Sequence, residues 1–243
     1  MQYWGVTDPG CVRPQNQDAY TMEQLDKNAL LCVVCDGMGG AKSGNVASTM
    51  AVDTFTKEIM TAYKSGMSFE QMSALMLSAC KTANFAVYDQ AQQGEEYRGM
   101  GTTLVAALIQ GKCAAVINVG DSRAYRINRN GIRRVTTDHS VVELMIQRGE
   151  VTPEEARHYP GRNLITRAVG TEPGVQCDLF RLDLERGDCV LLCSDGLTNL
   201  VDDQEILFEV VHGANKQQCC QSLLKIAQNR GAPDNVTCVL AQL

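Results

Sequence analysis

The chain has few aromatic residues and few histidines, and each shortage argues against a class of function. Of 243 residues, 5% are aromatic and three are histidine. Stacking on nucleic-acid bases needs aromatic side chains, and the net charge of −6 comes without a basic stripe for a phosphate backbone. We therefore expect no nucleic-acid partner and no histidine-rich metal site. His139 is interpreted as structural, and His158 and His212 as surface residues.

Long apolar runs are also missing. None reaches the roughly 18 residues that a membrane-spanning helix requires, so no membrane association is expected. The segment Met1–Gly5 shows no basic region followed by an apolar one, which predicts no signal peptide. The expected location is the cytoplasm.

Cysteine is the exception to this scarcity, with eleven residues scattered singly inside apolar runs. An odd number in a chain of this length indicates buried thiols in a reducing compartment. Cys32 and Cys35 have the spacing of a metal knuckle, but they lie in a strand-like run without a second pair, which argues against zinc. Cys219 and Cys220 are expected to be packing residues of a helix.

The pattern of apolar residues predicts strands and helices in blocks. Expected helices cover 45–63, 69–92, 139–147, 204–211 and 217–228, and expected strands cover 3–7, 30–35, 102–109, 112–119, 123–128, 131–135, 175–183, 188–193 and 236–241. Thr152-Pro153 predicts a further helix start, with proline at the first helical position. Short turns such as Asn130-Gly131 join neighbouring strands, which predicts antiparallel sheets. Amphipathic helices must then cover these sheets, giving an α+β sandwich. With no linker or repeat, we expect a single domain over 1–243.

Aspartates recur at the ends of the strand-like runs, at Asp36, Asp121, Asp195 and Asp234. Several carboxylates converging at one sheet edge would repel each other, by about 4 kcal/mol for a pair ~4 Å apart at an effective dielectric of about 20. Protonation or a bound hard cation relieves this repulsion. With almost no histidine available, the ligand set favours Mg²⁺ or Mn²⁺. For any single Asp-Gly, an ordinary turn remains the alternative.

Two further segments carry candidate chemistry. The run from Asp36 to Gly44 suggests a phosphate-binding loop, but Ala41 and Asp36 stand where that loop needs glycines. Its glycines instead let the backbone approach a ligand closely, and the Gly37 carbonyl is a candidate metal ligand. In the polar loop 13–18, Arg13 is suited to grip a phosphate with two parallel donors.

The motifs occur in the order found in one family. They are Gln17-Asp18, Asp36-Gly37-Met38-Gly39-Gly40, Gly101-Thr102-Thr103, Gly120-Asp121-Ser122-Arg123-Ala124-Tyr125, Asp138-His139-Ser140, Ser194-Asp195-Gly196 and Asp234-Asn235. Together they resemble the metal-dependent protein phosphatases of type 2C, the PPM family, and its compact bacterial members most of all. The resemblance spans the chain from Trp4 to about Val239.

The resemblance implies a four-layer α-β-β-α sandwich, in which two antiparallel sheets are flanked by helices and a two-metal centre lies between the sheets. It also implies a flap subdomain at about 139–170. The roles it implies are a bridging ligand (Asp36), a carbonyl ligand (Gly37), ligands of one metal (Asp195 and Asp234), a holder of metal-bound water (Asp18), a weaker third ion site (Asp121 with Asp195), a phosphate-binding arginine (Arg13) and flap residues that choose substrates (Arg162 and Asn163).

The implied reaction is hydrolysis of phosphoserine and phosphothreonine in proteins. Two Mn²⁺ or Mg²⁺ ions bridged by Asp36 activate a hydroxide that attacks phosphorus in line, with Arg13 stabilising the phosphate and no phosphoenzyme. The implied partners are phosphorylated proteins, including a bacterial Ser/Thr kinase, and the enzyme is expected to be a monomer. Met38 stands where animal members carry a histidine, and Gln17 where they carry a glutamate, so the general acid is interpreted as metal-bound water.

Two alternatives stay open at this point. One is a two-metal phosphohydrolase acting on small phosphoesters or nucleic acid, and the other is a non-enzymatic metal or adaptor module. The filled ligand positions argue against the second, and turnover on phosphopeptides compared with small phosphoesters would decide the first.

Overall fold

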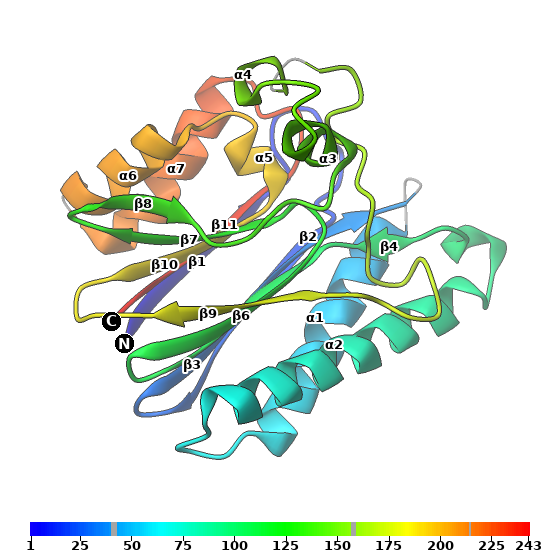
Figure 1. Ribbon diagram of the computed structural model, residues 1–243. Helices are drawn as coiled ribbons and strands as arrows, with labels where there is room; N and C mark the ends of the chain where they lie inside the picture. The colour runs from blue at the N-terminus through cyan, green and yellow to red at the C-terminus, as the bar shows by residue number, and fades with distance from the viewer. Residues whose placement is uncertain (40–42, 157–158, 214) are drawn as a thin grey trace.

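Two antiparallel sheets pack face to face in the computed structural model, which describes residues 1–39, 43–156, 159–213 and 215–243 (Figure 1). The five-stranded sheet has the order β1-β11-β10-β7-β8, formed by Gln2–Asp8, Val236–Gln242, Cys189–Cys193, Arg123–Asn128 and Gly131–Arg134. The six-stranded sheet has the order β2-β3-β5-β6-β9, formed by Asp18–Asp26, Ala29–Met38, Leu104–Gln110, Cys113–Val119 and Asp178–Asp183. Its sixth strand, β4 (Gly101–Thr102), pairs with the end of β3.

Helices cover the outer face of each sheet. In Figure 1, α1 (Gly44–Ala62) and α2 (Phe69–Ala91) lie against the six-stranded sheet, and α6 (Asp203–His212) and α7 (Lys216–Asn229) lie against the five-stranded sheet. The shorter elements are α3 (Val141–Gln147), α4 (Pro153–Ala156), α5 (Asp195–Thr198) and a 3₁₀ turn (Glu95–Tyr97). The predicted four-layer α-β-β-α sandwich is therefore confirmed. Among the described residues, no helix has the length and apolarity needed to cross a membrane.

The alternation of side chains along each strand separates the layers. In β3, Leu30, Cys32 and Val34 belong to the apolar cluster between the sheets, whereas Leu31, Val33 and Cys35 belong to the cluster under α1 and α2. Residues three apart in a strand point to opposite faces. The Cys32 and Cys35 thiols therefore cannot ligate a common ion, and burial raises the pKa of the Cys32 thiol to about 12. All eleven cysteines are free thiols and most are buried, including Cys219 and Cys220 of α7.

Three elements differ from the sequence prediction. Strand β2 was not expected, because Asp18–Asp26 is mostly polar and only partly buried, and so lacks an apolar pattern. The helical turn α5 and the 3₁₀ turn Glu95–Tyr97 were also missed, since three or four residues are too few to show a periodicity. The remaining helices and strands lie within a few residues of their predicted ranges.

The chain between β8 and β9 leaves the sandwich and carries α3 and α4. It begins close to β7 and β8, lies over α5 in Figure 1, and returns along α2 to the start of β9. On the return, the side chain of Asn84 in α2 accepts a hydrogen bond from Gly170 N (2.8 Å) and donates one to Glu172 O (3.0 Å). The predicted flap range, 139–170, lies within this excursion.

Candidate metal centre

The strand register brings two of the predicted carboxylates together. Asp18 at the start of β2 is directly opposite Asp36 near the end of β3. Asp36 follows Val34 by two residues, so its side chain faces the space between the sheets. Side chains directly opposite in an antiparallel pair have Cβ atoms about 5 Å apart, and like charges in that position are destabilising. This pair of strands therefore forms an acidic site between the sheets.

The facing sheet contributes two more carboxylates. Asp195 follows β10 as the first residue of α5, and Asp234 lies two residues before β11, the neighbour of β10. Burial raises the pKa of Asp36 well above its usual value, and the charges of Asp18, Asp195, Asp121 and Asp234 raise it further. Burial, followed by the charge of Asp234, raises the pKa of Asp195, and hydrogen bonding with the neighbouring Asp36 and Asn199 side chains opposes that rise. Carboxyl groups this close need a shared proton or a cation between them.

A serine connects the two sheets at this point. Ser194 accepts a hydrogen bond from Thr237 N (3.0 Å) and donates one to Asp18 Oδ2 (2.8 Å). Burial raises the pKa of Asp18 to about 7. Asp18 Oδ1 and Asp195 Oδ1 are both buried and have no hydrogen-bond partner among the described residues. Buried carboxylate oxygens without a partner are rare in proteins, so these two atoms indicate the position of a missing positive ligand.

The donor set fits a hard divalent cation. It consists of carboxylate oxygens with a backbone carbonyl nearby, which are the ligands that Mg²⁺ and Mn²⁺ prefer. No group of three or more acidic, histidine or cysteine side chains in the described part of the chain already has the geometry of a closed ligand shell. Binding an ion here therefore requires the carboxylates to turn toward a common point.

Gly37 occupies a position where no side chain fits. A Cβ atom built on Gly37 would lie 2.0 Å from Gly44 O and 2.6 Å from Gln17 O. The Gly37 amide donates a hydrogen bond to Gln17 O (3.0 Å). The backbone around the β3–α1 turn is thus packed closely beside Asp36. Ala41, one of the two residues that speak against a phosphate-binding loop, lies outside the described residues with its neighbours 40 and 42.

Arg13 lies beside the carboxylates, in ion-pair contact with Asp234 (Nη2 to Oδ2, 2.9 Å). About half of the Arg13 side chain is exposed (51%), which leaves the guanidinium group accessible to a ligand in solution. The sequence prediction that Arg13 belongs to the acidic site is consistent with this placement.

Asn235 holds the Arg13 loop, a role that sequence reasoning missed. Its side-chain amide donates to Pro9 O (3.0 Å) and Gln15 O (3.0 Å), and its Oδ1 accepts from Gln17 N (2.8 Å). Asn235 is 4% exposed. The Asp234-Asn235 motif marked this residue in the sequence, but it did not indicate which loop the side chain would contact.

Asp121 borders a cavity of about 550 Å³ that also reaches Asp195 and the predicted flap residues Arg162 and Asn163. The structure thus brings the proposed third-site carboxylate and the proposed substrate-binding residues to one cavity. Burial raises the pKa of Asp121 to about 8, with further increases from the charges of Asp195 and Asp138.

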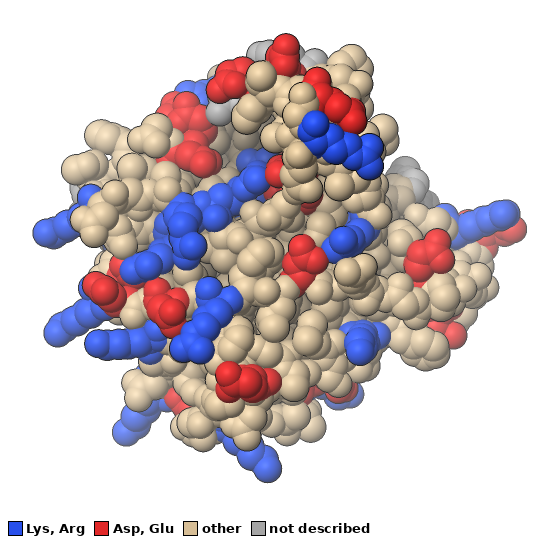
Figure 2. Space-filling model, viewed as in Figure 1, with Lys and Arg blue, Asp and Glu red and all other residues tan. Residues whose placement is uncertain are grey.

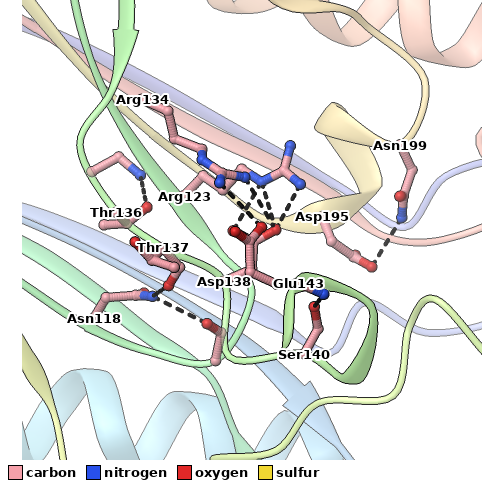
Figure 3. A network of polar contacts seen from close by, with 12 residues as sticks. Asn118, Arg123, Arg134, Thr136, Thr137, Asp138, Ser140, Glu143, Asp195 and Asn199 are labelled. Carbon is pink, nitrogen blue, oxygen red and sulfur yellow. Dashed lines mark hydrogen bonds and ion pairs between the residues drawn. The ribbon is translucent and has the colours of Figure 1, made fainter. Parts of the chain in front are cut away.

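A polar network fastens the start of the flap beside this cavity. In Figure 3, Arg123 and Arg134 converge on Asp138, with Nη2 of Arg123 2.6 Å from Oδ2. Arg134 also donates to Glu143 in α3 (3.1 Å). These contacts fix α3 to β7 and β8, so the wall of the cavity is held by the sheet.

Carboxylates pair with most of the arginines on the face around the β7–β8 hairpin. Figure 2 shows blue side chains over the β7–β8 hairpin, which carries Arg123, Arg126, Arg129, Arg133 and Arg134. Arg123 and Arg134 contact Asp138, and Arg126 contacts Asp188 at 2.7 Å. Most of this positive charge is therefore neutralised within the protein.

His139 has a structural position, as the sequence analysis expected. It is 6% exposed, its Nδ1 accepts a hydrogen bond from Gly120 N (3.1 Å), and its Nε2 lies 3.2 Å from Asp178. Nδ1 as acceptor and Nε2 beside a carboxylate indicate the neutral ring protonated at Nε2. His212 is exposed, and His158 lies outside the described residues. Met38, at the end of β3, offers no proton to a leaving group.

Comparison with known proteins assigns the family. The family model described as protein phosphatase 2C matches residues 14–236. The chain belongs to the protein phosphatase 2C family. Members of this family are protein serine/threonine phosphatases, so the predicted family and enzyme class are confirmed.

Relatives and solved structures extend over nearly the full chain. The protein phosphatase PhpP of Streptococcus pneumoniae is 35% identical over 239 residues, covering 98% of this chain and 96% of PhpP. The crystal structure of the serine/threonine phosphatase Stp1 from Staphylococcus aureus has a TM-score of 0.94 and 39% identity, covering 100% of this chain and 94% of Stp1. The catalytic domain of the phosphatase PstP, solved in complex with two manganese ions, has a TM-score of 0.87 and 31% identity, covering 99% of this chain and 97% of that domain.

Proposed function

We propose that this protein phosphatase 2C member hydrolyses phosphoserine and phosphothreonine in proteins at a pair of Mn²⁺ or Mg²⁺ ions held between its two sheets. The proposed ligands are Asp36 as the bridge, the Gly37 carbonyl, Asp195 and Asp234, with Asp18 holding coordinated water. The enzyme acts as a monomer with a single catalytic domain over 1–243, and residues 139–170 form its flap.

The observation that carries this proposal is the meeting of carboxylates from both sheets. Asp18 and Asp36 are opposite each other in one sheet, Asp195 and Asp234 lie at the facing strand ends, and the buried Oδ1 atoms of Asp18 and Asp195 lack partners among the described residues. A site built this way is costly without a cation. The PstP catalytic domain, which is similar over 99% of this chain, was solved with two manganese ions.

Bound there, divalent ions would supply the activated water and the charge neutralisation that attack on phosphorus requires. The chain's own residues then have distinct tasks. Arg13 leaves Asp234 to bind the phosphate with two parallel donors, and Ser194 holds Asp18 through Oδ2 while its Oδ1 stays available. Because the Met38 thioether carries no proton, we assign protonation of the leaving alcohol to water at the site.

A weaker third ion is proposed beside Asp121, sharing Asp195. The two residues border the same cavity, and the charge of Asp195 raises the pKa of Asp121. Arg162 and Asn163 reach this cavity from the flap. They are therefore proposed to contact the protein substrate next to its phosphorylated residue.

The proposed partners are phosphorylated proteins, among them a Ser/Thr kinase whose phosphorylation this enzyme reverses. The relatives named above are bacterial protein phosphatases, which supports a bacterial kinase as the opposing enzyme. Phosphoproteomics of a deletion strain, with and without the kinase gene, tests this pairing. The same phosphosites should gain occupancy without the phosphatase and lose it without the kinase.

The site assignment is tested by Mn²⁺ titration and phosphopeptide turnover of Asp195→Ala and Asp234→Ala. Each should lose measurable turnover and weaken Mn²⁺ binding. Asp183→Ala is the matched control, because that side chain is 76% exposed and pairs with the start of β6, at the opposite end of that strand from Asp121. Equal Mn²⁺ affinity in wild type and both site variants would refute the assignment. A higher kcat/KM on small phosphoesters than on phosphopeptides would point to the small-ester alternative.

A further inference from the structure

The Gly101-Thr102-Thr103 motif lies next to the acidic site, yet none of its residues is among the proposed ligands. Thr103 sits between β4 and β5 and is 2% exposed. Its hydroxyl accepts a hydrogen bond from Asp36 N (2.9 Å) and lies 2.7 Å from the hydroxyl of Ser122. Its own amide donates to Asp36 O (2.9 Å). Thr103 therefore contacts both the amide and the carbonyl group of Asp36. Its hydroxyl also contacts Ser122, the residue after Asp121.

The Asp36 amide can only donate, so the Thr103 oxygen accepts from it. The second bond joins two hydroxyl groups, either of which can donate, and Ser122 is 0% exposed. Hydrogen bonds in such a buried series polarise and strengthen one another. The result is a rigid connection from Asp36 to the turn that carries Asp121.

Packing enforces the same connection. Gly120 has φ +102°, and a Cβ atom built on it would lie 2.6 Å from Thr103 Cγ2. The turn before Asp121 is thus pressed against the Thr103 side chain as well as hydrogen-bonded to it. A second anchor, the bond from Gly120 N to His139 Nδ1 (3.1 Å), holds the opposite side of the turn.

We propose that Thr103 is a positioning residue. Through its hydroxyl contacts with Asp36 and Ser122, it fixes the distance between the two-ion centre proposed at Asp36 and the third-ion site proposed at Asp121. This inference rests on the proposed function, because it takes Asp36 and Asp121 as ligands. Without the hydroxyl, the Asp121 turn can shift relative to Asp36. An ion held by both regions then binds less tightly and is less well placed for the reaction.

The experiment uses variants that separate the two contacts. Ser122→Ala removes the link to the Asp121 turn and leaves the Asp36 amide paired with Thr103. Thr103→Val removes the hydroxyl at nearly constant volume and breaks both contacts, and Thr103→Ser keeps them. Thr56→Val is the matched control, since Thr56 is a buried threonine of α1 whose hydroxyl has no partner within the described residues.

Each chelated protein is titrated with Mn²⁺ in a calorimeter, and its kcat, KM and melting temperature are measured on the same preparation. We expect Ser122→Ala to weaken the weakest Mn²⁺-binding event and to lower kcat by about tenfold each, the usual effect of one lost buried hydrogen bond. KM should stay within about twofold because Arg13 is untouched. Thr103→Val should show larger losses. Thr103→Ser keeps the hydroxyl but loses the methyl group beside Gly120, so its Mn²⁺ affinity and kcat should lie nearer to wild type than those of Thr103→Val. Thr56→Val should match the Mn²⁺ affinity and kcat of wild type.

If the role of Thr103 were purely structural, its substitution would lower the melting temperature without changing the Mn²⁺ affinity of the folded protein. Folded Ser122→Ala and Thr103→Val proteins with wild-type Mn²⁺ affinity and kcat would overturn the inference. If Thr103→Val does not fold, the Ser122→Ala result alone decides. Equal Mn²⁺ binding by wild type and Asp36→Ala would instead overturn the proposed function, and this inference with it.

Discussion

Replacing Asp18 with asparagine should stabilise the metal-free protein at alkaline pH. The buried Asp18 carboxyl keeps its proton to about pH 7, whereas in the unfolded chain it ionises near 3.8. At about 1.4 kcal/mol per pH unit, forcing its ionisation in the folded protein costs about 4 kcal/mol. An amide avoids this cost but places an N–H at the position of the partnerless Oδ1, which costs about 1–3 kcal/mol. The net gain for Asp18→Asn at pH 8 is therefore about 1–3 kcal/mol.

The gain depends on pH in a defined direction. Below about pH 4 the carboxyl is protonated in both states and contributes no difference. Between pH 4 and pH 7 the folded state holds a proton that the unfolded state has released, so the free energy of unfolding of wild type falls as pH rises. Asp18→Asn has no such group and escapes this fall. It should therefore be no more stable than wild type at pH 4 and more stable at pH 8.

Mn²⁺ should reverse the order at pH 8. An ion that binds only the folded state adds about 2.7 kcal/mol per site at a concentration 100 times its Kd. A neutral amide attracts the ions less than a carboxylate, so wild type gains more than Asp18→Asn. In saturating Mn²⁺ we expect wild type to be the more stable of the two.

The assay is urea unfolding at pH 4 and pH 8, in chelator and in Mn²⁺. Asp188→Asn is the control: burial raises the pKa of Asp188, but hydrogen bonds from Glu185 N–H, Asn128 and Arg126 outweigh that effect and lower it. Asp188→Asn should therefore lose stability at pH 8 with or without Mn²⁺. If chelated Asp18→Asn is less stable than wild type at pH 8, the reasoning about the acidic site is wrong.

Three further variants test the neighbouring residues. Arg13→Ala should raise KM by about tenfold or more through loss of a bidentate phosphate contact, and Arg13→Lys should recover little of it; wild-type kinetics of Arg13→Lys would contradict this geometry. Asp121→Ala should remain folded and bind two Mn²⁺ ions tightly, but turn over at least about tenfold more slowly, and a normal kcat in saturating Mn²⁺ would make Asp121 an ordinary turn residue. Asn235→Ala loses three hydrogen bonds to the Arg13 loop, so it should lose about 2–4 kcal/mol of stability in thermal unfolding and have a higher KM. An unchanged melting temperature would show that other contacts hold the loop.

The elements predicted well are those whose apolar pattern is set by burial. The β3 run is buried on both faces, and the ranges of α1 and α2 follow their apolar residues. Strand β2 lacked such a pattern because its residues are mostly polar and only partly buried, and the pairing that makes it a strand comes from β3. Local sequence therefore predicted the buried strands but not β2.

The site could be predicted as a set of residues, and less well as an arrangement. Carboxylates at strand ends and the order of the motifs indicated which side chains belong together. The opposition of Asp18 and Asp36 depends on strand register, and the ion pair of Arg13 with Asp234 joins residues more than two hundred positions apart. The contacts of Asn235 and Thr103 are likewise formed by tertiary packing, which no local pattern encodes.

Turnover of a serine phosphopeptide by chelated wild type and Asp36→Ala, with Mn²⁺ added back stepwise and bound ions counted, tests the two-ion centre most directly. Wild type should be inactive in chelator and recover as two ions bind per chain. Asp36→Ala should stay folded with less than about a tenth of the wild-type kcat, a loss of at least about 1.4 kcal/mol. Full turnover by the chelated wild type, or more than about a tenth of the activity in Asp36→Ala, would contradict the account.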